Sequence, residues 1–334
     1  MTGEIPKPHI LEEQVFSITD AADFTTAALN VYCFQYYNNA IYRQFCNLLK
    51  QTPQTVTEVD HIPFLPISFF KTHAVTCGSF EPQVVFESSG TTGMVPSRHL
   101  VKKEALYQKS FQKGFETFYG QPEQYCILAL LPSYLERGAS SLVYMADHLM
   151  QSSNHPSNGF YLYDFEKLAQ TLADLEAKGQ KTLLIGVTYA LLDFAEQHPM
   201  PLKHTIVMET GGMKGRRKEL LRTEVHAQLK KAFALDAIHS EYGMTELLSQ
   251  AYAKEEGLFF TPPWMRVLLR EEDDPLSLQL GSRNGGINIM DLANIYSCAF
   301  IATEDSGRYA PGGGFTVMGR FDHAEVRGCS LMAM

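Results

Sequence analysis

The strongest chemical signal in this chain is a run of small hydroxyl and glycine residues that follows the short apolar segment 83–86: Ser88, Ser89, Gly90, Thr91, Thr92 and Gly93. Glycine lets the backbone approach a ligand closely and turn its N–H groups inward, and hydroxyls can donate to several phosphate oxygens. The run therefore predicts a cradle for nucleotide phosphates, with a flexible surface loop as the alternative. It is not a Walker motif, because Val95 and Arg98 stand five residues after the two glycines, where that pattern needs another glycine.

A second segment combines Tyr242 and Gly243 with Thr245 and Glu246, directly after a predicted strand. A threonine hydroxyl can bind phosphate, and a carboxylate such as that of Glu246 can bind Mg²⁺. The same Thr-Glu pair is also an ordinary way to begin a helix. Both interpretations stay open on this segment alone.

Three shorter signals complete the set. Gly211 and Gly212 end another predicted strand, where they could lie flat against a planar base or form a tight turn. Asp305 suits the two hydroxyls of a ribose, and Arg320 suits ribose or α-phosphate oxygens. Taken singly, Asp305 and Arg320 are more typical of surface turns than of a nucleotide site.

Composition limits the classes of function. The chain has 334 residues, of which 45% are hydrophobic, enough for one or two domains with a large core. A formal charge of −9 argues against a nucleic-acid partner. The N-terminus lacks the organisation of a signal peptide and the longest apolar runs are too short to span a bilayer, so we expect a cytoplasmic protein. Six scattered cysteines contain no C-x-x-C pair, which argues against a zinc site or a disulfide framework.

The elements that must position these residues follow from apolar periodicity. The first 80 residues are predicted to be mainly helical, with Asp20 as an N-cap, helical spacing through Lys50 and then a proline-punctuated segment at 62–70. Helices are expected at 103–119, 165–178, 189–197 and 217–233, alternating with short apolar strands at 125–131, 182–187, 205–209 and 237–240. This alternation predicts an α/β fold of layered, parallel-rich sheets with flanking helices. Closely spaced strand signals then predict a small C-terminal β subdomain, with strands at 265–269, 286–290, 299–303, 315–318 and 324–327.

The order of the segments resembles the adenylate-forming superfamily of acyl-CoA synthetases, peptide-synthetase adenylation domains and luciferases, over residues 88–322. The resemblance implies that the first loop holds the β- and γ-phosphates of ATP, that Thr245 and Glu246 serve the α-phosphate and Mg²⁺, and that Asp305 binds ribose. Together with the predicted elements, it gives a mainly helical region at 1–80 packed on the core, an α/β adenylate-forming core at 81–258 and the small β subdomain at 259–334. The implied ATP-binding residues are Ser88, Ser89, Gly90, Thr91, Thr92, Gly93, Gly211, Gly212, Tyr242, Gly243, Asp305 and Arg320.

The C-terminal segment is similar to one branch, the acyl-protein synthetase family, typified by the fatty-acid activating component of bacterial luciferase systems. The similarity lies in Glu325–Leu331, together with Pro63–Pro66 and Glu209–Gly212. Members make an acyl-adenylate and move the acyl group to their own cysteine, and Cys329 stands in the matching place. The superfamily normally continues beyond the position of Asp322 into a mobile lid with a catalytic lysine, and we expect no such lid here.

The implied chemistry is attack of a carboxylate on the α-phosphorus of ATP, followed by attack of the Cys329 thiolate on the acyl-adenylate. Thr245, Glu246 and Cys329 are then the catalytic residues, and Lys71 is a further candidate phosphate ligand. If residues 324–329 are extended, Arg327 favours the Cys329 thiolate and Glu325 opposes it.

ATP and Mg²⁺ are the implied cofactors, and the substrate is a fatty or aryl carboxylic acid. The final acceptor is a partner protein, such as a reductase or an acyltransferase, or CoA. Two other functions stay open. One is a carboxylate–CoA ligase of the phenylacetate type with its lid supplied by another chain, and the other is a catalytically silent acyl- or nucleotide-binding subunit. The sequence leaves the oligomeric state open.

Overall fold

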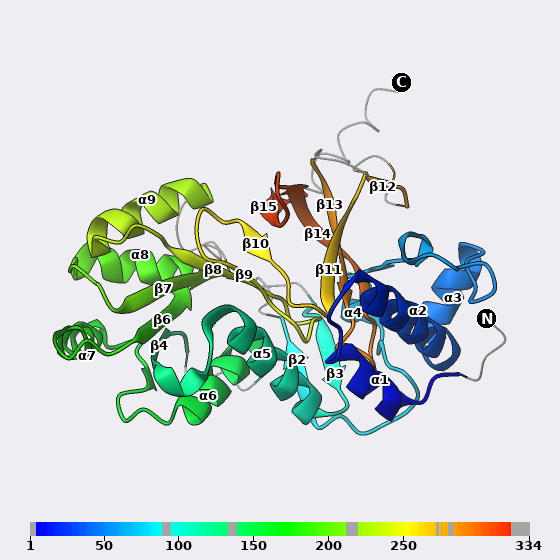
Figure 1. Ribbon diagram of the computed structural model, residues 1–334, viewed down its shortest axis with the longest axis horizontal. Coiled ribbons are helices and arrows are strands. Elements are labelled where there is room, and N and C mark those ends of the chain that lie inside the picture. Colours follow the sequence, from blue (N-terminus) through cyan, green and yellow to red (C-terminus); the bar gives the residue numbers. More distant parts are fainter. Residues whose placement is uncertain are drawn as a thin grey trace.

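A computed structural model describes residues 5–88, 95–132, 139–211, 220–271, 274, 276–279 and 284–321 of the chain. In this described part, one 13-stranded sheet runs through both lobes of the molecule (Figure 1). Twelve of its strands follow one another from edge to edge: β12 (Leu278–Gln279), β11 (Met265–Arg270), β13 (Asn284–Asp291), β14 (Phe300–Tyr309), β15 (Phe315–Arg320), β10 (Phe259–Phe260), β9 (Ala251–Ala253), β8 (His239–Tyr242), β7 (Thr205–Thr210), β6 (Thr182–Val187), β4 (Cys126–Leu130) and β5 (Gly159–Phe160). The thirteenth, β1 (Leu65–Pro66), pairs with β14.

The half of the sheet from β5 to β8 is parallel, and helices connect its successive strands. Every residue of β4 and β6 is buried, as expected for short apolar strands covered on both faces. The predicted strands at 125–131, 182–187 and 205–209 are confirmed to within a residue. The helices of this half are α5 (Glu104–Tyr119), α6 (Ser141–Ser153), α7 (Phe165–Ala177), α8 (Thr188–Gln197) and α9 (Arg222–Phe233), and a 3₁₀ turn, η2 (Pro122–Gln124), precedes β4.

Two predicted boundaries in this half were wrong. The helix expected at 217–233 begins at Arg222, because Leu221 has extended backbone and its N–H is capped by the Glu224 side chain at 2.8 Å. The strand expected at 237–240 lies at 239–242, so that its last residue is Tyr242. This shift matters for function, since it puts Tyr242 at the end of the strand and not in the turn that follows.

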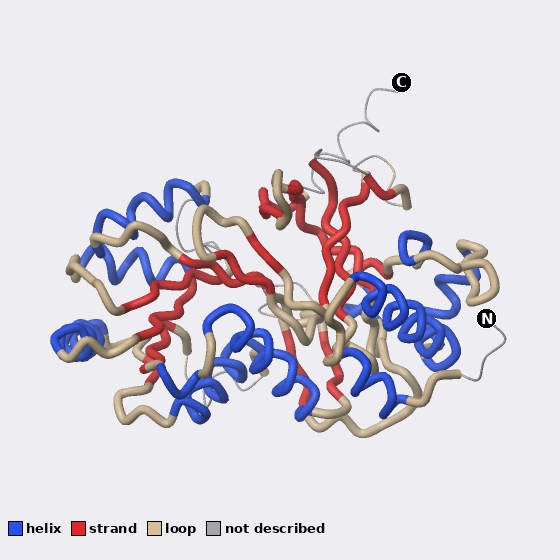
Figure 2. Tube along the Cα trace, viewed as in Figure 1, coloured by secondary structure: helices blue, strands red, loops and turns tan. Residues whose placement is uncertain are grey.

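The other half of the sheet, from β9 to β12, is antiparallel and contains the strands predicted for the β subdomain. These strands are longer than expected, since β14 has ten residues and β13 has eight, and through β10 they continue the parallel half (Figure 2). The strand predicted at 324–327 lies outside the described residues. The predicted boundaries at residues 80 and 258 stay a prediction.

The N-terminal helices α1 (Pro8–Val15), α2 (Ala21–Asn38) and α3 (Ala40–Leu48) pack beside the antiparallel half (Figure 1). Asp20 is confirmed as the N-cap of α2, since its carboxylate accepts hydrogen bonds from Ala22 N and Asp23 N at 2.9 and 2.8 Å. The helical spacing predicted through Lys50 is divided between two helices, because extended backbone at Asn39 ends α2 and the Asn39 side chain caps α3.

Gln35 of α2 joins the N-terminal helices to the bend at 294–299. Its Nε2 donates to Asn294 O and Ile295 O at 2.9 and 3.0 Å, and its Oε1 accepts from Ala299 N at 3.0 Å. Between these helices and the phosphate-loop region lie η1 (Val59–His61), β1 (Leu65–Pro66), which pairs with β14, and α4 (Phe69–Thr72). Within the described residues, each helix is too short or too polar to cross a bilayer.

Candidate active site

Two predicted site segments leave the sheet side by side. β7 and β8 are parallel neighbours whose last paired residues are Thr210 and Glu241, so Gly211 and Tyr242 follow at the same edge. Gly211 has φ of +72°, a conformation that favours glycine, and its carbonyl oxygen accepts a hydrogen bond from Thr188 Oγ1 at 3.2 Å. Ligands of parallel sheets bind at the carboxyl ends of the strands. Gly212 lies outside the described residues.

Tyr242, Asp305 and Arg320 meet at the junction of the two halves of the sheet. The Tyr242 hydroxyl donates to Asp305 Oδ2 at 2.7 Å, and Arg320 Nε lies 3.4 Å from Asp305 Oδ1. Asp305 is buried, whereas the Arg320 side chain is 80% exposed. Burial and the Asp305 carboxylate hold the pKa of Tyr242 well above its usual value, so the hydroxyl stays a donor. The surface-turn interpretation of Asp305 and Arg320 is wrong, because both lie in paired strands.

A buried arginine, Arg270, interacts electrostatically with Asp305. Arg270 donates to Thr303 O at 2.6 Å and to Asn288 Oδ1 at 2.9 Å, and its charge acts on Asp305. A Cβ at Gly286 would lie 2.5 Å from Arg270 Cζ, so glycine is needed there to admit the guanidinium. The sequence gives no signal for this pair, because it depends on the register of β11 and β13.

Thr245 and Glu246 form a turn between β8 and β9. The interpretation of this pair as the start of a helix is therefore wrong. Glu246 is only 4% exposed, and this burial raises the pKa of its carboxyl group. The Ser97 hydroxyl and the nearby charges of Arg320 and Lys71 act in the opposite direction. The Glu246 carboxyl group is therefore under the influence of one hydroxyl and two cations from three other segments.

Ser88 and Ser97 close the base of the predicted phosphate loop. Ser88 N donates to Ser97 O at 3.0 Å, and Ser97 N donates to Ser88 Oγ at 2.9 Å. These residues extend the hairpin of β2 (Val84–Glu87) and β3 (Arg98–Val101). The stem of the loop therefore stands beside Glu246. The loop residues themselves, Ser89, Gly90, Thr91, Thr92 and Gly93, lie outside the described residues.

The donor set fits a magnesium ion that arrives with a nucleotide. Mg²⁺ usually binds one or two carboxylates and completes its shell with phosphate oxygens and water. Glu246 supplies one carboxylate, and the described residues contain no group of three or more histidine, cysteine, aspartate or glutamate side chains that could hold a metal.

Gly243 has a steric role that the sequence did not indicate. A Cβ at this position would lie 2.5 Å from Glu241 Oε1, so any other residue would displace that carboxyl group. The Thr210 hydroxyl donates to Glu241 Oε2. Burial, with a smaller effect from Glu209, raises the pKa of Glu241 to about 7.

Comparison with known proteins decides the family. The profile of the LuxE acyl-protein synthetase family matches residues 17–334 of the chain. The chain belongs to this family. A long-chain-fatty-acid–luciferin-component ligase from Vibrio harveyi is 22% identical to it over 348 residues, which cover 95% of this chain and 89% of that protein.

Solved structures show the same fold. An open conformation of 2-hydroxyisobutyryl-CoA ligase in complex with 2-HIB-AMP and CoA aligns with a TM-score of 0.66 at 12% identity, over 92% of this chain and 72% of that chain. ATP-bound MatB from Rhodopseudomonas palustris aligns with a TM-score of 0.54 at 14% identity, over 72% of this chain. The aligned part is about half of the MatB chain, 49% of its length. The predicted family, its ligase class and the α/β fold are therefore confirmed.

Within this acyl-protein synthetase, the structure brings together Tyr242, Glu246, Asp305 and Arg320 with the stem of the loop at Ser88. Thr245 lies beside them, half-buried, and Lys71 joins them from α4. Cys329 lies outside the described residues. Sequence reasoning missed Arg270, Glu241, His99, Asp291 and Asn294, whose roles depend on contacts between distant segments.

Proposed function

We propose that this acyl-protein synthetase uses ATP to activate a fatty carboxylic acid as an acyl-adenylate and then transfers the acyl group to its own Cys329. The observation that carries the proposal is the contact of Asp305 with both Tyr242 and Arg320, together with the action of Arg320, Lys71 and Ser97 on the charge of Glu246. One anionic polyphosphate with a ribose at one end would satisfy all of these groups together.

In the first half-reaction, a carboxylate oxygen of the acid attacks the α-phosphorus of ATP, and the bond to pyrophosphate breaks. The Asp305 carboxylate accepts hydrogen bonds from the ribose hydroxyls, and the exposed Arg320 guanidinium faces the α-phosphate. Lys71 and the loop stem at Ser88–Ser97 face the leaving phosphates. Glu246 would hold Mg²⁺, which supplies neutralisation of phosphate charge when bound. Most of the rate enhancement then comes from positioning and electrostatic stabilisation.

In the second half-reaction, a cysteine thiolate attacks the carbonyl carbon of the acyl-adenylate, a thioester forms and AMP leaves. The five described cysteines are poor candidates, because burial raises the pKa of each thiol: Cys33, Cys46, Cys77, Cys126 and Cys298. This supports Cys329 as the acyl acceptor. We propose that a partner protein in the cytoplasm, a reductase or an acyltransferase, then receives the acyl group.

The test is intact-mass analysis after incubation with ATP, Mg²⁺ and a panel of straight-chain fatty and aryl acids. Wild type should gain one hydroxylamine-labile acyl group, and so should the control Cys33→Ser, which removes a half-buried thiol. Cys329→Ser should stay unmodified yet keep acid-dependent exchange of pyrophosphate into ATP, because only the second half-reaction is lost.

Two outcomes would overturn the proposal. If wild type stays unmodified while added CoA becomes acylated, the protein is a carboxylate–CoA ligase. If no acid supports pyrophosphate exchange, it is a binding subunit and not an enzyme.

A further inference from the structure

The turn that carries Thr245 and Glu246 is held by side chains from outside the site. Asp291, at the end of β13, accepts hydrogen bonds from Leu248 N at 2.6 Å and Ser249 N at 3.0 Å. These bonds fix the residues just after the turn. The two carbonyl groups of the turn itself have other partners.

Asn294 binds the Glu246 carbonyl. Its Nδ2 donates to Glu246 O at 2.8 Å and to Cys298 O at 3.0 Å. Both amide hydrogens are therefore used on carbonyl oxygens, which fixes the orientation of the amide and directs Oδ1 toward His99.

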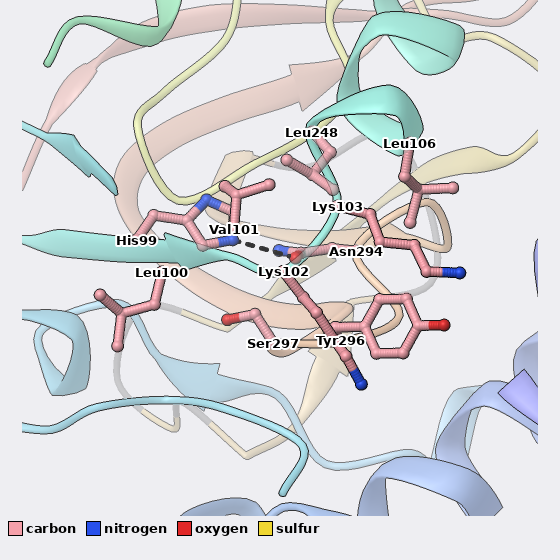
Figure 3. Close-up of a pocket in the computed structure, with 10 residues that line it drawn as sticks. All are labelled: His99, Leu100, Val101, Lys102, Lys103, Leu106, Leu248, Asn294, Tyr296 and Ser297. Atoms are coloured by element: carbon pink, nitrogen blue, oxygen red, sulfur yellow. Dashed lines mark hydrogen bonds between the residues drawn. The ribbon is translucent and has the colours of Figure 1, made fainter. Parts of the chain in front are cut away.

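His99 binds the Thr245 carbonyl. Its Nδ1 lies 2.8 Å from Thr245 O, and its Nε2 lies 3.1 Å from Asn294 Oδ1 (Figure 3). Thr245 O and Asn294 Oδ1 can both only accept, so a hydrogen bond to either oxygen requires a proton on the ring nitrogen that faces it, and the contact to Thr245 O is the shorter of the two. The Phe70 ring packs edge-on against the His99 ring, with 5.8 Å between the ring centroids, and His99 is only 1% exposed.

His99 also belongs to the stem of the phosphate loop. It lies in β3, two residues after Ser97, whose hydroxyl donates to Glu246. The segment 97–99 thus contacts the Thr245–Glu246 turn twice, through the Ser97 hydroxyl just before β3 and through the His99 ring within β3. The position of the turn relative to the loop is therefore set by side-chain bonds, since β2 and β3 form a sheet separate from the one that contains β8.

The His99 and Asn294 side chains do not form a ligand site of their own. The cavity beside them, bordered by His99, Lys102, Asn294 and Tyr296, has a volume of about 10 Å³, which holds at most one water (Figure 3). Lys102 closes it by lying over the Tyr296 ring at 4.5 Å. His99 and Asn294 can therefore affect the reaction only by positioning the Thr245–Glu246 turn.

We propose that His99 and Asn294 are positioning residues that orient Thr245 and Glu246 toward the nucleotide and its metal ion. This inference rests on the proposed function, because it concerns the same site. Groups that orient a metal ligand without touching the metal typically change metal affinity by about 10- to 100-fold when they are removed. We expect an effect of that size here.

The test compares His99→Phe, which keeps a ring but removes the donor, with His99→Asn, whose amide can donate near the place of Nδ1. Asn294→Ala removes the second anchor. The control is Asn158→Ala, since Asn158 also donates to a buried carbonyl, Met150 O at 2.8 Å, but lies in the parallel half of the sheet. All variants are compared by melting temperature, by the Mg²⁺ concentration that gives half-maximal pyrophosphate exchange, and by KM for the acid.

His99→Phe and Asn294→Ala should raise the Mg²⁺ requirement about 10- to 100-fold and leave KM for the acid unchanged. His99→Asn should recover most of the affinity. Asn158→Ala should lower the melting temperature without changing the Mg²⁺ requirement. An unchanged Mg²⁺ requirement in His99→Phe, or the same rise in Asn158→Ala, would overturn the inference.

Hydrogen exchange without nucleotide separates this inference from the proposed function. Amides of residues 246–249 should exchange at least about tenfold faster in His99→Phe than in wild type, because an anchor of the turn is lost. Equal exchange rates would show that His99 does not hold the turn. Absence of pyrophosphate exchange in wild type would instead refute the proposed function.

Discussion

Asp305 and Arg320 face each other across the β14–β15 ladder, and the carboxylate that contacts Arg320 also accepts a hydrogen bond from Tyr242. Tyr242 ends the parallel half of the sheet, whereas Asp305 and Arg320 belong to the antiparallel half. The proposed nucleotide site is therefore built where the two halves meet, and both must be in place to form it.

Asp305→Asn should raise KM for ATP about tenfold, equivalent to about 1.4 kcal/mol, because ribose then binds a neutral amide in place of a carboxylate. KM for the acid should not change. Pyrophosphate exchange at varied ATP measures both values. Tyr242→Phe keeps the carboxylate and should have a smaller effect, and a wild-type KM for ATP in Asp305→Asn would contradict the assignment of Asp305 to ribose.

Glu246→Gln should lower the pyrophosphate exchange rate about 100-fold or more, because the amide keeps the shape of the side chain but loses the charge that binds Mg²⁺. Raising Mg²⁺ should restore part of the rate. Glu255→Gln, on the exposed loop between β9 and β10, is the matched control and should behave as wild type. Equal rates in the two variants would show that Glu246 is not the metal ligand.

Gly243→Ala should destabilise the protein by about 1–3 kcal/mol, because the new methyl group would collide with the Glu241 carboxyl. Chemical denaturation measures the loss. Gly114→Ala in α5 has nothing within 4 Å of the added Cβ and should not destabilise the fold. The double variant Glu241→Ala with Gly243→Ala should lose less than the sum of the single changes, and strict additivity would contradict the collision.

Glu241→Gln should change how stability depends on pH. Folding raises the pKa of Glu241 from 4.5 to about 7, so between these values the folded state keeps a proton that the unfolded state has released. The contribution of Glu241 to the free energy of unfolding of the wild-type protein therefore falls as pH rises from 4.5 through 7. The glutamine variant lacks this loss and should gain stability relative to wild type, by on the order of 3 kcal/mol between pH 4.5 and pH 8.

Urea denaturation at several pH values measures this difference. Both proteins contain the same histidines, so the contribution of a buried histidine such as His99 cancels in the comparison. A difference that stays constant with pH would show that Glu241 titrates normally.

Sequence patterns predicted what depends on neighbours along the chain. The apolar run at 182–187 has one stable arrangement, a strand buried on both faces, and Asp20 caps the helix that follows it directly. Tyr242, Glu246, Asp305 and Arg320 were found because their residue types suit a nucleotide and their order resembles a known set of motifs. The contacts between these residues are seen only in the structure.

The supporting residues could not be found in this way. Asn294 and His99 are separated by 195 positions along the chain, and each looks like an ordinary polar residue in its own segment. Arg270 has a role only because Gly286 in the paired strand leaves space for it. Such roles arise from register and long-range packing, which a single sequence does not reveal.

The three hydrogen bonds of Gln35 to the bend at 294–299 have a consequence for anyone who builds hybrids of this enzyme. The bend carries Asn294, so the first helices of the chain and a late loop act as two pieces of one support. A hybrid that takes α2 from one relative and the bend from another would mismatch them. Exchanges should therefore move α2 and residues 291–299 together, although more than 250 positions separate them.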